Sequence, residues 1–495
     1  MSLAERPLWA QTAVSLSEAL RSGDVSSAEV TESVLGRVEE VEASVHAYIT
    51  LTPEVARSTA AAVDAARGRG EDPGPLAGVP VAIKDIICTE GIKTTAGSRL
   101  LANYIPPYPA TVAARLAAAG LPMIGKTNLD EFAMGSSTEN SACFPTCNPW
   151  DLTKVPGGSS GGSSAAVAAG EAIWSVGTDT GGSIRQPASL CGVVGLKPTY
   201  GLVSRSGLIA FASSLDQAGP FARCVADAAL LLGAMAGHYP RDATSLPNPV
   251  PDYSAGLGDG VDGLRIGVVK ELMGEGIQPG VRSQVEAAVG LLEKLGAQVG
   301  EVTLPTFAYG IDAYYLIAPA EASANLARFD GVRYGVRVDG PDVATMNGRT
   351  RAAGFGAEVK RRIMLGTYAL SAGYYDAYYG KAQKVRTLII QDFQRAYADF
   401  DLLVSPTSPT TAFGLGERTA DPLTMYLSDV CTVPSSLAGA TALSIPCGLA
   451  PEDGLPVGFQ LMGKALDEAT VLRAAYALER ELALPAPLPE IRVPA

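Results

Sequence analysis

The stretch Pro156-Gly-Gly-Ser-Ser-Gly-Gly-Ser-Ser164 forms the densest glycine and serine run in the chain, and Thr178-Asp-Thr-Gly-Gly-Ser-Ile-Arg-Gln-Pro187 follows soon after it. These runs lead into the apolar segments Ala165-Ala-Val-Ala-Ala169 and Val193-Val-Gly-Leu196, whereas a flexible linker would continue in polar residues. Small residues let a ligand approach the backbone and leave amide groups pointing into a shared space. We therefore predict two glycine-rich loops that build a binding site.

The sequence around these loops alternates between short apolar strands and alanine-rich helices. Between Pro75 and about residue 235 we predict a strand at Val79–Ile83, a helix at Thr111–Ala119 and a strand at Leu121–Ile124. Asp401-Leu-Leu-Val-Ser-Pro406 has the composition of another buried strand. Such alternation is typical of an α/β fold built on a sheet.

The chain is expected to form one main domain with a helical segment in front of it. Residues 1–70 are interpreted as helices, since Ser26-x-x-Glu29 matches a capping box and valines then recur at helical spacing. The sheet pattern stops for a mainly helical excursion at about 280–400 and then resumes. We therefore predict a single catalytic domain over residues 71–485.

Composition and charge exclude several classes of function. With a net charge of −13 and a pI near 4.8, the chain is a poor candidate for holding tRNA or DNA by itself. No apolar run is long enough to cross a membrane, and residues 1–9 lack the pattern of a signal peptide. Seven cysteines show no framework spacing, and the pair Cys143 and Cys147 has no second pair to complete a metal site. We expect a cytoplasmic protein with reduced thiols and no bound metal.

Three familiar motifs occur in the sequence, and none fits its context well. Gly157-Gly-Ser-Ser-Gly161 matches a hydrolase nucleophile motif, but that mechanism needs a histidine, and the chain has only His46 and His238. Gly120 to Thr127 matches a phosphate-binding loop, yet a helix and not a strand precedes it. Val81-Ala-Ile-Lys84 resembles a kinase strand, although the other kinase motifs are missing. A Ser-His-Asp hydrolase remains an alternative.

A serine hydrolase without a suitable histidine needs another base, and Lys84 is the best candidate. It ends an apolar strand, and burial disfavours the charged form of a lysine, which makes the amine a usable base. Ser183 ends the run Thr180-Gly-Gly-Ser183, where successive backbone N–H groups could bind an oxyanion. Each such donor typically contributes about 3–4 kcal/mol to an acyl-transfer transition state.

These residues resemble the motifs of the amidase signature family. In that family a strand lysine, a serine within G-G-S-S-G-G-S and a serine ending T-D-x-G-G-S-I-R form a triad, and here they correspond to Lys84, Ser159 and Ser183. The resemblance implies a large mixed sheet flanked by helices on both faces, the fold of this family. It also implies that Ser183 is the nucleophile, that Ser159, reached through a cis peptide, relays the proton, and that Lys84 is the final base. Thr180, Gly181 and Gly182 would contribute oxyanion amides.

Within the family, residues 10–480 are most similar to the A subunits of glutamyl-tRNA(Gln) amidotransferases. Motifs far from the triad carry this similarity, including Gly373-Tyr-Tyr-Asp-Ala-Tyr-Tyr379 and Asp421-Pro-Leu-Thr-Met-Tyr426. The resemblance implies a glutaminase in a heterotrimer with subunits B and C. It implies no cofactor in this chain, since ATP and Mg²⁺ would be used by the partner that also holds most of the tRNA. Residues 1–70 are expected to pack on the core and contact a partner.

The same resemblance suggests residues that would bind the substrate. The α-carboxylate of glutamine needs a fixed cation and its α-ammonium group an anion. Arg362 and Asp429 are the candidates by family position, with Tyr314 as a wall and Arg361 as the rival of Arg362. Two alternatives remain open at this point: a free-standing amidase that acts on a small carboxylic amide, and a scaffold whose site has decayed.

Overall fold

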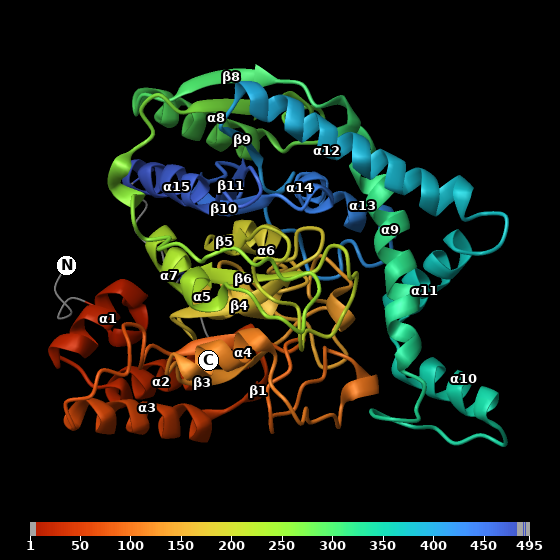
Figure 1. Ribbon diagram of the computed structural model, residues 1–495, viewed down its shortest axis with the longest axis horizontal. Helices are drawn as coiled ribbons and strands as arrows, with labels where there is room; N and C mark the ends of the chain where they lie inside the picture. Colours follow the sequence, from red (N-terminus) through yellow and green to blue (C-terminus); the bar gives the residue numbers. More distant parts are fainter. Residues whose placement is uncertain (1–5, 483–488, 490, 492–495) are drawn as a thin grey trace.

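The computed structural model describes residues 6–482, 489 and 491 (Figure 1). The predicted N-terminal segment 1–70 and the predicted catalytic domain 71–485 extend beyond the described residues, at 1–5 and at 483–485. In the described chain eleven strands form one sheet, in the order β1-β3-β2-β4-β6-β5-β10-β11-β9-β7-β8. Their bounds are β1 (Tyr48–Leu51), β2 (Val81–Lys84), β3 (Met123–Thr127), β4 (Trp174–Asp179), β5 (Val194–Lys197), β6 (Gln217–Ala222), β7 (Arg265–Val269), β8 (Gln298–Val302), β9 (Leu402–Pro406), β10 (Thr441–Leu449) and β11 (Pro456–Gly463).

Helices cover both faces of the sheet. The first group, α4, α7, α15 and α8, packs side by side, while α2, α5 and α6 form a second contiguous row. The sheet is mixed, because β2 runs parallel to β3 and β4 whereas β4 runs antiparallel to β6. The predicted α/β fold with two helical layers is therefore confirmed. The helices are α1 (Ala13–Ser22), α2 (Ser27–Val45), α3 (Pro53–Gly68), α4 (Thr111–Ala118), α5 (Gly161–Ala169), α6 (Arg185–Cys191), α7 (Val225–Met235), α8 (Pro279–Lys294), α9 (Gly310–Asn325), α10 (Val343–Gly354), α11 (Ala357–Ala369), α12 (Lys381–Asp399), α13 (Pro422–Leu427), α14 (Val433–Ala438) and α15 (Glu468–Leu482).

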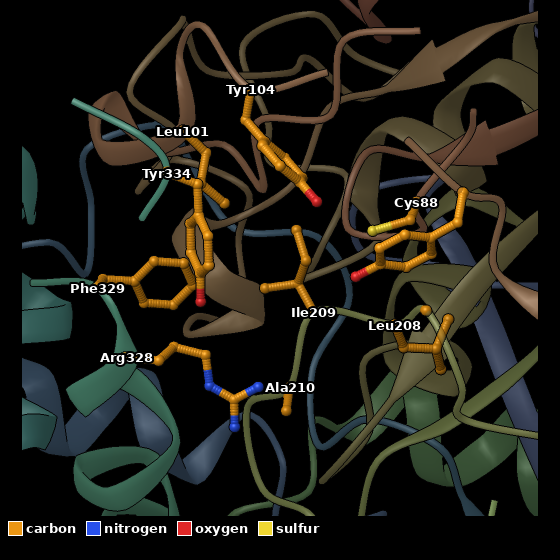
Figure 2. A pocket seen from close by; sticks show the side chains of 11 residues that line it. Cys88, Leu101, Tyr104, Leu208, Ile209, Ala210, Arg328, Phe329 and Tyr334 are labelled. Atoms are coloured by element: carbon orange, nitrogen blue, oxygen red, sulfur yellow. The ribbon is translucent and has the colours of Figure 1, made fainter. Parts of the chain in front are cut away.

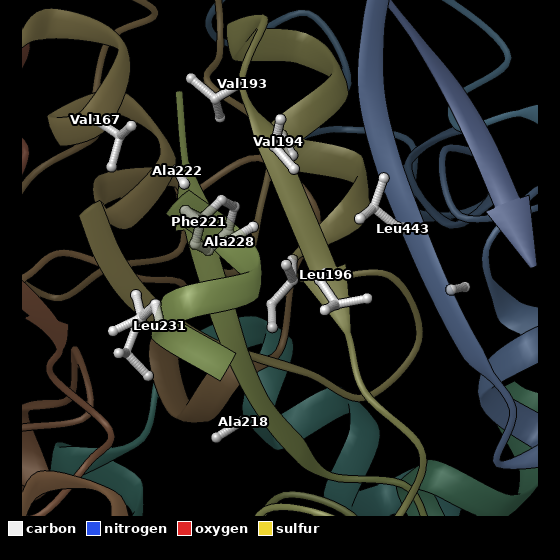
Figure 3. Packing of buried hydrophobic residues seen from close by; sticks show 14 of the residues in the cluster. Val167, Val193, Val194, Leu196, Ala218, Phe221, Ala222, Ala228, Leu231 and Leu443 are labelled. Atoms are coloured by element: carbon white, nitrogen blue, oxygen red, sulfur yellow. The ribbon is translucent and has the colours of Figure 1, made fainter. Parts of the chain in front are cut away.

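The central strands of the sheet pack into an apolar core, which fixes the positions of the strand ends. Phe221 on β6, Leu196 on β5 and Leu443 on β10 are fully buried, and α7 places Leu231 on the same cluster (Figure 3). Burying one such side chain typically stabilises a fold by about 1.5–3 kcal/mol. The strand ends that carry the candidate site residues are therefore well fixed.

The N-terminal segment contains a strand that the sequence does not predict. The capping box of Ser26 and Glu29 is present at the start of α2, as predicted. However, residues 48–51 form β1, an edge strand that pairs antiparallel with β3. A four-residue strand is too short to show a clear period. Its position depends on Gly125 of β3, where a side chain would collide with the Thr50 carbonyl, so tertiary contact decides the structure here.

The helical excursion brings two of its helices into close contact beside the sheet. It contains α8 to α12 and one strand, β8. The sequence predicts a mainly helical segment here and does not predict this strand. Figure 1 shows α9, α10 and α11 beside the sheet, on the side away from α1 to α3. Gly366 of α11 lies against the Pro319 carbonyl of α9, where any side chain would overlap backbone. This close approach places Tyr314 of α9 and Arg362 of α11 in one cluster.

Candidate active site

The candidate site begins where β2 ends, at a lysine that is completely buried. The Nζ atom of Lys84 hydrogen-bonds Ser159 Oγ at 2.8 Å, Ser160 Oγ at 2.8 Å and Thr178 Oγ1 at 3.0 Å. Within the described residues it forms no salt bridge. The structure thus brings two of the three predicted triad residues together, and it adds Ser160 and Thr178, to which the sequence alone assigns no role.

The environment of Lys84 favours its neutral form. Burial lowers the pKa of this lysine to about 7, while three more distant carboxylates oppose the shift: Asp130, Asp179 and Asp216. The Ser160 hydroxyl also donates to the Thr178 carbonyl at 3.0 Å, so with its single proton committed it can only accept from Lys84. The Ser159 hydroxyl is therefore the serine that is free to pass a proton to the neutral amine.

Ser159 lies in the loop that leads into α5, and its backbone is held by the second glycine-rich loop. The Gly158–Ser159 peptide is cis, as the family resemblance implies. The Gly158 N–H donates to Gln186 Oε1 at 2.9 Å, and the Ser159 carbonyl accepts from Asp130 N–H at 3.3 Å. The two glycine-rich runs of the sequence are thus linked directly, through Gln186.

Ser183 lies in the turn after β4, close to the first loop. Its carbonyl accepts from the Ser160 N–H at 3.2 Å, which ties the two loops together. Its Oγ makes no hydrogen bond to Ser159 Oγ in the described chain, so the relay between these hydroxyls stays a prediction. The turn is fixed by a buried salt bridge of 3.0 Å between Asp179 and Arg185. Arg185 in turn donates four hydrogen bonds to the C-terminal part of the sheet domain. The acceptors are the carbonyl of Thr432, which precedes α14, the hydroxyls of Ser435 and Ser436 on α14, and Gln460 Oε1 on β11.

The backbone around Ser183 offers free hydrogen-bond donors. In the described chain, none of the N–H groups of residues 180–183 donates to a protein acceptor. Nearly all buried N–H groups in proteins are paired, so a run of free ones indicates a ligand site. The Thr180 hydroxyl donates to Asp216 at 2.7 Å and fixes the turn. This arrangement supports the predicted oxyanion role of Thr180, Gly181 and Gly182, which stays a prediction.

Both glycines of the turn are needed because neighbouring side chains touch the backbone there. A Cβ on Gly181 would lie 2.7 Å from the Tyr314 ring, and one on Gly182 would overlap the Thr432 hydroxyl. We expect Gly182→Ala to lower kcat about tenfold to a hundredfold, because the shifted backbone misplaces the oxyanion donors. Steady-state kinetics with glutamine would measure this, with Gly233→Ala as the control, since no atom lies near that Cβ. An unchanged kcat at Gly182→Ala would contradict the oxyanion assignment.

Arg362 is buried beside the loops, and its guanidinium group is only partly used by the protein. Its Nε donates to Glu358 at 2.7 Å. The ring centroids of Tyr315, Tyr426 and Phe211 lie 5.2 to 5.7 Å from the guanidinium carbon of Arg362. The two terminal nitrogens of Arg362 have no hydrogen-bond partner among the described residues. A buried guanidinium with free donors is suited to a carboxylate.

Arg361, the rival candidate, occupies a different environment. Its side chain is 42% exposed and pairs with the other oxygen of Glu358. A solvated and paired arginine is a weak ligand for a carboxylate, so the structure favours Arg362 for this role. Neighbouring helical residues point about 100° apart, which is why one of the two can enter the site and the other cannot.

Asp429 and Tyr314 complete the cluster around the turn. The Asp429 carboxylate accepts a 2.7 Å hydrogen bond from Ser136 and lies 3.3 Å from the position of a Cβ on Gly182. Burial raises the pKa of Asp429 to about 7, and a cation bound beside it would favour the ionised form. The Tyr314 ring lies against Gly181. The candidate anion and the candidate wall therefore both lie against the backbone of the turn, and, while burial raises the pKa of each of them, the charge of Arg362 lowers it.

The residues that a phosphate-binding loop or a Ser-His-Asp mechanism would need, Lys126 and the two histidines, have other contacts in the structure. Lys126, at the end of the apparent phosphate loop, is a buried residue of β3 and pairs with Asp85 at 3.1 Å. The ring of His46 lies against Phe144, and His238 Nδ1 lies 3.2 Å from the Ser245 carbonyl. Among the described residues, neither histidine hydrogen-bonds a triad serine. Since Ser159 has Lys84 as its partner, the geometry does not support a Ser-His-Asp mechanism.

A separate cavity of about 230 Å³ lies between the helical excursion and the loops around Cys88 (Figure 2). Arg328, Phe329 and Tyr334 line one side of it, and Leu208 to Ala210 another. None of the predicted site residues lines this cavity. It nevertheless lies next to the cluster, because the following residue, Phe211, is a neighbour of Arg362.

Comparison with known proteins agrees with this geometry. The family model described as Amidase matches residues 29–472. The chain belongs to the amidase family. It is 60% identical over 486 residues to the A subunit of the glutamyl-tRNA(Gln) amidotransferase of Moorella thermoacetica, covering 98% of this chain and 99% of that one. This confirms the resemblance that the triad motifs and the C-terminal motifs predicted.

Solved structures of other family members share the fold. The crystal structure of the A subunit of the Thermotoga maritima glutamyl-tRNA(Gln) amidotransferase matches with a TM-score of 0.82 at 42% identity, covering 98% of this chain and 99% of that one. A peptide amidase from Stenotrophomonas maltophilia matches with a TM-score of 0.83 at 32% identity over 98% of this chain and 99% of that one. The fold is thus common to amidases with different substrates, so the substrate must be argued from the pocket.

Proposed function

We propose that this chain is the glutaminase component of a tRNA-dependent amidotransferase and supplies the ammonia that converts Glu-tRNA(Gln) into Gln-tRNA(Gln). One observation carries the choice of substrate: a buried arginine with free donors, Arg362, lies near enough to a buried carboxylate, Asp429, to lower the pKa of that carboxylate against the effect of burial, and Asp429 lies against Gly182 of the catalytic turn. An amino acid with a side-chain amide satisfies both groups. An aryl amide would leave both charges unpaired, which is costly in a buried site.

In the proposed reaction the Ser183 Oγ attacks the side-chain amide carbon of glutamine. Its proton passes to the Ser159 oxygen while the Ser159 proton moves to the neutral Nζ of Lys84. The N–H groups of residues 180–183 stabilise the negative oxygen that develops. The protonated relay then gives a proton to the leaving nitrogen, and ammonia departs. Water, activated by the same serine and lysine, hydrolyses the ester to glutamate and free enzyme.

The proposed assembly follows from the relatives being A subunits, which implies partner subunits. We place this chain with subunits B and C in a cytoplasmic heterotrimer. The partner that also holds the tRNA uses ATP and Mg²⁺, and this chain needs no cofactor of its own. The strongly acidic charge supports this division, because phosphates would be repelled. In the described chain no helix is long and apolar enough to span a membrane.

The choice between the neighbouring arginines gives a matched test of the substrate. Arg362→Lys is expected to raise the KM for glutamine about tenfold to a hundredfold, because an ammonium group cannot replace the planar guanidinium. Arg361→Lys is expected to change KM less than threefold, about 0.6 kcal/mol at most. Initial rates of ammonia release from the complex would measure both. Equal effects of the two variants, or a larger effect at Arg361, would contradict the assignment.

A further inference from the structure

The buried arginine of the candidate site is held by a carboxylate on its own helix. Glu358 precedes Arg362 by four residues on α11, so the two side chains lie on the same face. The Nε of Arg362 donates to Glu358 Oε1 at 2.7 Å, and both side chains are buried. Because a buried charge without a counter-charge is costly, this pair allows Arg362 to stay inside the protein. Its terminal nitrogens have no partner among the described residues and remain free for a ligand.

A tyrosine from a second helix binds the same oxygen of this carboxylate. The Tyr426 hydroxyl donates to Glu358 Oε1 at 2.8 Å. Burial would raise the pKa of Glu358, but the charge of Arg362 and the hydroxyl of Tyr426 hold that pKa below its usual value, so the carboxylate is ionised. Hydrogen bonds to an ionised acceptor are roughly twice as strong as those between neutral groups. We call Glu358 and Tyr426 together the Glu358–Tyr426 bridge.

The bridge reaches the second charged residue of the site through one turn of backbone. Tyr426 lies on α13, and its carbonyl accepts from the Asp429 N–H at 3.2 Å. The Asp429 carboxylate lies against Gly182 of the catalytic turn. An unbroken series of contacts therefore runs from the guanidinium group of Arg362 through the bridge to Asp429. These contacts set the positions of the candidate cation and the candidate anion relative to each other.

The helix that carries Tyr426 is too short to hold its position alone. α13 has six residues, and its Leu423 and Leu427 are exposed. Isolated helices shorter than about 12–15 residues are marginal in water, so the position of α13 depends on tertiary contacts. The Tyr426 ring stacks on that of Tyr315 of α9, with 3.8 Å between the centroids and 20° between the planes. This stacking and the bridge join α13 to α9 and α11 (Figure 1).

The other oxygen of Glu358 has a partner that restrains it less. Arg361 pairs with Glu358 Oε2, but the Arg361 side chain is 42% exposed. Exposed ion pairs contribute little, because water screens them and two long side chains must be ordered. The buried hydroxyl of Tyr426 is therefore the contact that fixes the carboxylate and, through it, Arg362.

We propose that Glu358 and Tyr426 are positioning residues, which hold Arg362 at the place where it meets the α-carboxylate of glutamine while Asp429 meets the α-ammonium group. The proposal rests on the proposed glutaminase function and deepens it. Both residues act through Arg362 and Asp429, and neither has a step in the chemistry. The triad is held by contacts of its own, so loss of the bridge weakens substrate binding more than it slows the reaction. The bridge therefore affects KM more than kcat.

The test measures steady-state ammonia release by the full complex at varied glutamine concentration. Tyr426→Phe keeps the ring and its stacking but removes the hydroxyl, and Glu358→Gln keeps the shape but removes the charge. We expect KM to rise about threefold to tenfold in Tyr426→Phe and about tenfold to a hundredfold in Glu358→Gln, with kcat changed less than about threefold. The effect of Tyr426→Phe is the smaller one, because a cavity of about 90 Å³ beside the pair admits water to Glu358.

Tyr397→Phe is the matched control for the loss of a hydroxyl. Tyr397 lies on α12 beside Phe393, and its hydroxyl is buried without a hydrogen-bond partner in the described chain. The same chemical change here should leave both KM and kcat as in the wild type. Thermal unfolding of all variants shows whether the fold is intact, and Tyr426→Phe carries the test even when Glu358→Gln does not fold.

A double-mutant cycle separates the positioning of Arg362 from general damage to the site. Once Arg362→Lys has removed the guanidinium group, the addition of Tyr426→Phe should raise KM by less than about twofold, because the bridge has no arginine left to place. Effects on KM that multiply in the double variant would show that Tyr426 acts independently of Arg362, and would overturn the proposal.

The remaining outcomes distinguish failure of the bridge from failure of the proposed function. Unchanged kinetics in Tyr426→Phe, or a fall in kcat at unchanged KM, would overturn the positioning role and leave the glutaminase function intact. A larger rise of KM in Tyr315→Phe than in Tyr426→Phe would overturn it as well, because the neighbouring tyrosine would then be the one that matters for binding. If the wild-type complex hydrolyses no glutamine, the proposed function itself fails.

Discussion

Ser183→Ala should lower kcat for glutamine hydrolysis by about 10⁴-fold or more while KM changes little. The Ser183 Oγ is the atom that must form the ester, and no neighbouring serine can replace it. Ser159 is completely buried and already bound to Lys84, and Ser160 donates to the Thr178 carbonyl. Ammonia release from the purified complex would measure the loss. Activity within tenfold of wild type would remove Ser183 as the nucleophile.

A double variant of the histidines is the control for this experiment. His46→Ala/His238→Ala should retain most of the glutaminase activity, because neither ring hydrogen-bonds a triad residue in the part of the chain that the structure describes. His46 does end α2 in a left-handed conformation with φ of 57°, so thermal unfolding must be recorded for the variant. A loss beyond tenfold with unchanged unfolding temperature would restore a Ser-His mechanism as the better account of catalysis.

Lys84→Met is the second substitution with a large expected effect, and it should lower kcat about 10²- to 10⁴-fold. Methionine fills a similar volume but has no lone pair of suitable basicity, so the proton of Ser159 has no acceptor. In the wild type, activity should rise with pH through about 7, because burial lowers the pKa of Lys84 to that value and only the neutral amine is a base. A pH profile of kcat/KM that stays flat between pH 6 and 8 would contradict this role.

The same pKa shift predicts the stability of Lys84→Met. The folded pKa of Lys84 lies below the value of about 10.4 in an unfolded chain, so the unfolded state binds more protons between these two values. Burying Lys84 therefore destabilises the fold most fully below pH 7, and the penalty fades as pH rises toward 10. Lys84→Met should have a higher free energy of unfolding than the wild type at pH 7. Denaturant unfolding would measure it, and a lower value would show that the hydrogen bonds of Lys84 outweigh its desolvation.

Much of the catalytic centre could be predicted from the sequence because its residues lie in short, unusual segments. Two glycine-rich runs that enter apolar elements, and a lysine at a strand end, each indicate a site before any contact is known. The shortage of histidine narrows the chemistry further. The family resemblance supplied the roles of Ser159 and Ser183, and the structure brings Lys84, Ser159 and the Ser183 turn together.

Other features depend on three-dimensional contacts that a sequence does not carry. Ser160 and Thr178 bind Lys84 because β2 and β4 are neighbours in the sheet, which no local pattern states. Arg361 and Arg362 are adjacent and chemically identical, so only the packing of α11 on α9 separates them. The expected contact of residues 1–70 with a partner stays a prediction, because a partner surface depends on which apolar side chains remain exposed after folding.

The central claim is that glutamine forms an ester on Ser183, and a rapid-quench experiment on the complex tests it most directly. Glutamine is mixed with the complex, the reaction is stopped with acid within milliseconds, and the peptides are analysed by mass spectrometry. The account predicts a γ-glutamyl adduct on the peptide that contains Ser183, absent in Ser183→Ala and when glutamate replaces glutamine. An adduct on another residue, or glutamate production at full rate with no adduct at any time, would contradict it.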